Sequence, residues 1–195
     1  RSKINHNAVL GHMSGMKIAN AKYYITRTDV KTFPISQNTM DANLDSVQSG
    51  VLPRRIFVFF VTQEASNGSS TKNPFNFQHF NINHIAANID GEQFPLKAYK
   101  PDFENQKYTR EYVSLFEAAN QNEVTSTISI SREEFGSGFT IFGFNFAPDL
   151  SDGAGMLGHL CEPRRGNLRL EVKFTKALSE SINAIVYCEF DNCIQ

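Results

Sequence analysis

The most apolar stretch of this sequence lies near its middle, at residues 56–61. Its letters are IFVFFV, so β-branched and aromatic side chains occupy both alternating sets of positions. Successive side chains of a strand point to opposite faces, and neither face of this one suits water. The pattern predicts a strand buried on both sides.

Other runs alternate between apolar and polar positions, as strands with one buried face do. Residues 85–89 carry Ile, Ala and Ile at every second position and are followed by Asp90-Gly91, a strong two-residue hairpin signal. Residues 168–174 alternate apolar side chains with Arg, Glu and Lys. We expect further strands at residues 19–35 (an outer or edge strand), at residues 139–146, where Gly143 indicates a bulge or a close backbone approach, and at residues 182–190.

One segment departs from the strand pattern. Between residues 106 and 120, apolar side chains follow Tyr108 at offsets of 4, 7, 8 and 11, a helical stripe. Asn105 is a candidate N-cap, and Asn120 lies where a left-handed residue would end the helix.

Polar, Gly-rich or Ser-rich composition predicts loops at residues 36–50, 64–74 and 151–166. About eight strands with long connections favour an all-β fold, an eight-stranded jelly-roll β-sandwich of viral capsid type with one embedded helix. The 17 phenylalanines suffice for a large core, and 195 residues suit a single domain. We therefore predict a tail or linker at residues 1–18 and one domain at residues 19–195.

Charge and cysteine content exclude some functions. The 19 basic and 20 acidic residues nearly cancel, which predicts no direct sequence-specific nucleic-acid binding. The sequence has no apolar run of about 18 residues, so we expect no membrane insertion. The cysteines Cys161, Cys188 and Cys193 form no CxxC pair and are typical of reduced thiols in an intracellular setting or an intracellularly assembled particle.

Candidate chemistry is sparse. The pairs His6/His12, His79/His84 and His159/Cys161 lack the four-ligand spacing of a structural zinc site. The carboxylate pairs Asp102/Glu104 and Glu133/Glu134 suit solvated loops, Asn67-Gly68-Ser69 suits a turn, and Gly153, Gly155 and Gly158 lack the context of a phosphate loop. Cys188, in an apolar strand, suits a buried hydrophobe. We predict a protein that is not an enzyme, with no catalytic residue, cofactor site or metal site.

Several motifs in fixed order carry a family resemblance across nearly the whole chain. They are LPRRIFVFFV, NGSSTKNPFNFQHFNI, NIDGEQFPLKAYKPDFENQKYTREYVSLF, ISREEFGSGFTIFGFNFAPDLS, GNLRLEVKFTKAL and NAIVYCEFDN. Together they resemble the double jelly-roll major capsid proteins, or hexon proteins, of Polinton/Maverick elements and adintoviruses.

The resemblance implies that the chain is the C-terminal jelly roll, with residues 1–18 ending a preceding one. It implies a structural role in pseudo-hexameric homotrimers of an icosahedral virion, assembled inside the host cell. The implied partners are other copies of the chain in the capsid lattice and a minor or penton capsid protein. The helix would lie at a subunit border or cap an open end of the sandwich, so its candidate subunit-contact residues are Tyr108, Tyr112 and Phe116.

Two alternatives stay open. A carbohydrate-binding or cupin-like jelly roll is compatible with the fold, although cupin chemistry needs clustered His and Glu ligands. A single jelly-roll vertex, or penton, protein of the same viruses is the other alternative. An upstream jelly roll in the same reading frame would favour the hexon-like prediction.

Overall fold

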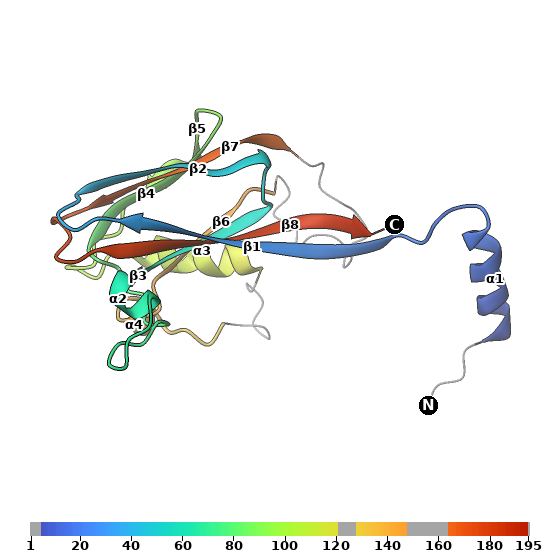
Figure 1. The fold of residues 1–195 in the computed structure, drawn as a ribbon, viewed down its shortest axis with the longest axis horizontal. Coiled ribbons are helices and arrows are strands. Elements are labelled where there is room, and N and C mark those ends of the chain that lie inside the picture. The colour runs from blue at the N-terminus through green and yellow to red at the C-terminus, as the bar shows by residue number, and fades with distance from the viewer. Residues whose placement is uncertain (1–4, 121–127, 148–163, 195) are drawn as a thin grey trace.

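The computed structural model describes residues 5–120, 128–147 and 164–194. In this part of the chain, eight strands form two four-stranded antiparallel sheets that pack face to face (Figure 1). The strands are β1 (Tyr23–Ile35), β2 (Asp41–Val51), β3 (Arg55–Thr62), β4 (Ile82–Ile89), β5 (Glu92–Tyr99), β6 (Ile141–Asn145), β7 (Arg165–Phe174) and β8 (Ile182–Ile194).

The strand order identifies the architecture. One sheet has the order β1-β8-β3-β6 and the other β2-β7-β4-β5. The first strand thus pairs with the last, the second with the seventh, the third with the sixth and the fourth with the fifth. A long antiparallel ribbon wound into two layers gives this pairing, which is the jelly roll. The predicted fold class is confirmed.

The core lies between the two sheets. Ile56, Val58 and Phe60 of β3 point inward and are fully buried. In β7 the apolar side chains are buried, while Arg169 is exposed between them, as the alternation predicted. A buried side chain of this size contributes roughly 1.5–3 kcal/mol, so the interleaved Phe, Ile, Leu and Val residues account for a large share of the stability.

One loop prediction was wrong. Residues 36–50 were expected to form a loop, yet most of them belong to β2. Ala42, Leu44 and Val47 are buried, but the spacing changes from two to three because the chain bulges between Leu44 and Gln48, with Ser46 at φ 56°. The bulge breaks the period-two signal, and the Asn, Asp and Ser side chains on the outer face mask the strand.

The predicted hairpin and the predicted outer strand are both confirmed. Asp90 and Gly91 join β4 to β5 with φ of 51° and 94°, the left-handed pair that a tight turn of this kind requires. β1 lies at the edge of its sheet and pairs with β8 alone. β8 itself continues to Ile194, four residues beyond the predicted end at 190.

The embedded helix is α3 (Thr109–Ala119). It ends at Asn120, which is left-handed at φ 53°, as predicted. It begins after Tyr108, so the predicted cap at Asn105 was wrong: the Asn105 backbone N–H donates to Asp102 Oδ1 at 3.1 Å and its side-chain amide to Oδ2 at 2.8 Å. These two bonds hold Asn105 in a turn of its own.

Three further helices occur in the described residues, so the expectation of a single embedded helix was incomplete. α2 (Gln63–Ser66) and α4 (Arg132–Phe135) are single turns within connections, and α4 carries a capping box between Ser131 and Glu134. α1 (His6–Met16) falls in the predicted tail, stands apart from the sandwich (Figure 1) and has no buried residue. No described helix is long and apolar enough to span a bilayer.

Candidate assembly surface

Helix α3 lies against β6 because a glycine leaves room for it. A Cβ atom at Gly143 would come within 2.6 Å of the Ala118 Cβ and 3.2 Å of the Leu115 Cα. The close backbone approach predicted at this glycine is confirmed. The Arg55 guanidinium adds a second attachment, since its Nη1 donates to the Ala118 carbonyl at 3.1 Å, at the helix end where a positive charge is favourable.

Below the helix, a second hydrophobic cluster forms outside the main core. Its buried members are Tyr108, Leu115 and Phe135. Phe57 and Ile141, on the outer face of the β1-β8-β3-β6 sheet, pack against it. Helix α3 therefore covers part of one sheet with an apolar layer of its own.

The three candidate contact residues all belong to this cluster. Tyr108 is 6% exposed and lies between the rings of Phe103 and Phe135, at centroid distances of 5.1 and 5.8 Å. Tyr112 and Phe116 are half-buried and 4.9 Å apart, and the Tyr112 hydroxyl donates to the Ile130 carbonyl at 2.9 Å. The structure brings the three together, with most of their surface against their own chain. Their role at a subunit border stays a prediction.

The surface between α3 and β5 carries apolar groups that the sequence patterns did not single out. Leu96 of β5 is 94% exposed and Val113 of α3 is 44% exposed. Beside them lies a groove of about 480 Å³ whose walls include Phe94, Tyr99 and Val113. The sequence contained a partial signal for this surface. Val113 is apolar but lies off the helical stripe, which places it on the outward-facing side of the helix.

Two ion pairs where β3 begins are largely withdrawn from water. Arg55 pairs with Glu189, and Arg54 Nε lies 3.8 Å from Asp191 Oδ1. All four side chains are at most 15% exposed. Breaking one such pair leaves an uncompensated buried charge, which makes this end of the sheet intolerant of single substitutions.

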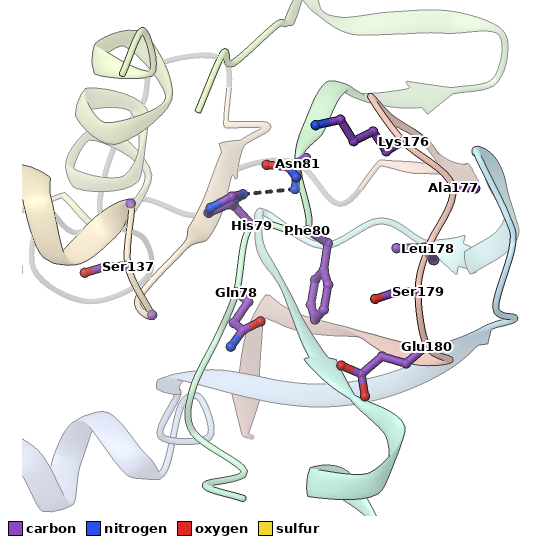
Figure 2. A pocket seen from close by; sticks show the side chains of 12 residues that line it. Gln78, His79, Phe80, Asn81, Ser137, Lys176, Ala177, Leu178, Ser179 and Glu180 are labelled. Atoms are coloured by element: carbon purple, nitrogen blue, oxygen red, sulfur yellow. Dashed lines mark hydrogen bonds between the residues drawn. The ribbon is translucent and has the colours of Figure 1, made fainter. Parts of the chain in front are cut away.

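A second groove, shown in Figure 2, lies between residues 78–81 and 176–180 and has a volume of about 400 Å³. His79 Nδ1 accepts a hydrogen bond from the Asn81 backbone N–H at 2.9 Å, and its ring stacks on Phe103 at 4.2 Å. Burial lowers the pKa of His79, which keeps the ring neutral. The charged groups at the rim pair with other residues: Lys176 with Glu104 at 2.8 Å, and Glu180 with Lys72 at 3.1 Å.

The other candidate residues occupy separate places. His84 Nε2 on β4 lies 3.9 Å from Glu171 Oε1 on the neighbouring strand β7 of the same sheet, and Glu133 and Glu134 lie in α4. Within the described ranges, no three His, Cys, Asp or Glu residues are grouped as metal ligands.

Some of the remaining candidate residues lie within the described parts of the chain and others lie outside them. Asn67-Gly68 ends α2 in a turn, as predicted, with Gly68 at φ 97°. Cys188 is fully buried, and burial raises its pKa to about 11, so it is the predicted hydrophobe rather than a nucleophile. His159, Cys161 and the three glycines Gly153, Gly155 and Gly158 lie outside the described residues.

Comparison of the sequence with known proteins identifies a longer animal relative. The chain matches no protein-family profile. It is 32% identical over 174 residues to the uncharacterized protein F54H12.2 of Caenorhabditis elegans; the match covers 87% of this chain and 40% of the relative. The chain thus spans less than half the length of that relative.

Among solved structures, the fold resembles that of the Faustovirus major capsid protein. The TM-score is 0.56 at 8% sequence identity, with 94% of this chain and 35% of the capsid protein covered. At this identity the likeness concerns the fold alone. The chain has a jelly-roll sandwich of the kind found in that capsid protein.

Proposed function

We propose that this chain is a structural capsid protein that assembles with copies of itself and catalyses no reaction. The observation that carries the proposal is the match of nearly the whole chain to one third of a viral major capsid protein, over 94% and 35% of the two chains. The wound order β1-β8-β3-β6 and β2-β7-β4-β5 supports it, because capsid jelly rolls use this architecture.

In its finer form, the proposal assigns the chain to the C-terminal jelly roll of a double jelly-roll, hexon-like protein of the Polinton/Maverick and adintovirus type. An animal relative of which the chain matches only 40% is consistent with a longer polypeptide. Residues 1–18, including α1, would end a preceding jelly roll. The exposure of Leu10, Met13 and Met16 on α1 supports this, since such side chains are expected to contact another domain.

The assembly proposed here is a homotrimer whose six jelly rolls form a pseudo-hexagonal tile of an icosahedral virion. Such a ring needs a head-to-tail contact that closes on itself. The partners are further copies in the capsid lattice and a minor or penton protein, and assembly takes place inside the host cell. We place α3 at a subunit border, where the half-buried Tyr112 and Phe116 retain surface for a neighbour.

Light scattering coupled to size exclusion tests the trimer. The polypeptide in which this chain naturally occurs is expected to elute with the mass of three copies. Tyr112→Ala and Phe116→Ala should reduce trimer recovery at a temperature where circular dichroism shows the variants folded. Met40→Ala, a change at an exposed apolar residue far along the chain from α3, serves as the control and should leave trimers unchanged. A wild-type protein of monomer mass would refute the trimer, and unchanged trimers in both α3 variants would refute the border placement.

A further inference from the structure

Strand β5 contains a bulge that side chains from β5 and α3 hold in place. Between Phe94 and Tyr99, residues 95–98 face Ala86 alone on β4. The Gln93 side-chain amide donates to the first two carbonyls of the bulge, at 3.3 and 3.1 Å. The Arg110 guanidinium of α3 donates to the last two, at 2.7 and 3.1 Å. Two side chains thus fix a segment that would otherwise be a loose loop.

This fixed bulge presents a leucine to solvent. Leu96 is 94% exposed, the largest exposed fraction among the large apolar side chains of the described residues. A single exposed leucine needs no explanation on a flexible loop. Here the backbone is held on both sides, so the ordering of the segment has already taken place before any partner arrives. Such preorganisation favours binding.

The groove beside the bulge has apolar walls that suit an apolar side chain such as Leu96. It measures about 480 Å³ and is walled by Phe94, Tyr99 and Val113. Asn145 also lines it and is 93% buried. The Asn145 Oδ1 accepts from the Ala147 N–H at 3.0 Å, while its buried Nδ2 has no hydrogen-bond partner among the described residues. A buried amide donor of this kind calls for an acceptor.

Each of the two features also carries one exposed charge without an ion pair in the described part of the chain. Lys97 follows Leu96 on the bulge, and Glu117 lines the groove. Both are exposed, and neither forms an ion pair with another residue in the described ranges. Arg110 also lines the groove, but its guanidinium donates to the Lys97 and Ala98 carbonyls of its own chain. Glu117 is therefore the groove charge that can meet Lys97 of another copy.

We infer that the Leu96 bulge of one copy docks in the α3–β5 groove of a second copy. Leu96 enters between the apolar walls, and Lys97 meets Glu117 of the second copy. Arg110 joins the bulge to the helix that walls the groove, so both lie on one surface patch. A patch that contains both parts fits a two-fold contact, in which each feature is used twice.

This inference rests on the proposed self-assembly and adds a surface to it. A head-to-tail ring closes one tile, whereas a two-fold contact joins one tile to the next. The two contacts are therefore separable by experiment.

Charge-swap variants of the natural polypeptide test the inference by sedimentation velocity at low ionic strength. Lys97→Glu and Glu117→Lys should each weaken association between tiles by at least about tenfold, because the two-fold contact contains the pair twice. The double variant should restore association. Leu96→Asp should weaken it by more than about a hundredfold, whereas Met40→Asp, at another exposed apolar site, should not.

Cysteine pairing gives an independent readout that does not depend on affinity. A mixture of Leu96→Cys and Val113→Cys proteins should form a disulfide between two chains, seen as a doubled mass on a non-reducing gel. Undiminished association of Leu96→Asp, or no interchain disulfide, would overturn the inference while leaving trimers, and hence the proposed function, intact. The disulfide and the charge rescue in a protein that forms no trimer would support the inference and refute the proposed tile.

Discussion

The two sheets of this sandwich differ in what they turn outward. The outer face of β2 and β7 is charged, with Asp41 opposite Lys173 and Arg169 Nε 3.3 Å from Asp45 Oδ1. The outer face of β3 and β8 is apolar, with Phe57 opposite Tyr187 and Phe59 opposite Ile185. An antiparallel sheet with one face in water needs polar residues there, so the outer face of β2 and β7 suits solvent and that of β3 with the adjoining part of β8 does not.

The apolar sheet face is instead covered by connecting segments. The Phe77 ring lies 4.3 Å from Phe59, and the cluster under α3 packs against Phe57. The segments between β3 and β4 and between β5 and β6 therefore bury apolar surface of the sheet and contribute to the stability of the fold. The difference teaches that this protein has a second hydrophobic core on one side, and that α3 serves both stability and the proposed contacts.

The largest effect is expected at the centre of this second core. Phe135→Ala should lower the free energy of unfolding by about 3–5 kcal/mol, because the ring is fully buried and its removal leaves a cavity. Urea denaturation followed by circular dichroism measures the change. Phe75→Ala, at a ring that is 70% exposed, is the matched control and should cost far less. Equal losses at both positions would contradict the existence of a second core.

Disturbing the contact between α3 and Gly143 of β6 should have a smaller effect on stability. Gly143→Ala places a methyl group 2.6 Å from the Ala118 Cβ and should cost about 1–3 kcal/mol by overpacking. Hydrogen exchange of α3 should become faster than that of β7, on the other sheet. Adding Ala118→Gly should recover part of the loss by making space. No recovery would show that the clash at Ala118 does not explain the cost.

A buried carboxyl on α3 makes the helix-covered side sensitive to pH. Glu111 is 3% exposed and accepts the Lys100 N–H at 3.1 Å; burial raises its pKa above the ordinary value. Its folded pKa exceeds the unfolded one, so its stabilising contribution is present at pH below the unfolded value and is lost as the pH rises through the folded value.

Glu111→Gln keeps the acceptor and removes the titration. Relative to wild type, this variant should be more stable at about pH 7 than at about pH 4, because burial raises the pKa of Glu111 and the amide does not titrate. Paired urea titrations at the two pH values measure the difference. A difference that stays constant across the interval would rule out the buried, titrating carboxyl.

The charged sheet face should tolerate substitution best. The Arg169 and Asp45 side chains are 56% and 71% exposed, and a pair so open to water contributes little. Arg169→Ala should change the free energy of unfolding by less than about 0.5 kcal/mol. Thermal melts at low and high salt provide the check. A loss of several kcal/mol would mean that this face, too, carries a structural network.

The sequence predicted strands best where side chains alternate or are uniformly apolar, as at Leu168 or Phe60. β2 was missed because the bulge at Ser46 shifts the alternation. A helical stripe predicts the side of a helix that packs on its own chain, which is why Tyr112 and Phe116 were found and Val113 and Glu117 were not. The groove depends on a bulge and a helix brought together by hydrogen bonds from Arg110, a juxtaposition that no local pattern contains.

Electron microscopy of the natural polypeptide at high protein concentration tests the capsid role most directly. We expect trimeric particles of pseudo-hexagonal outline that associate into sheets or closed shells, with the β-sandwich of each copy resolved in the reconstruction. Single, unassociated particles at every concentration and ionic strength would contradict it.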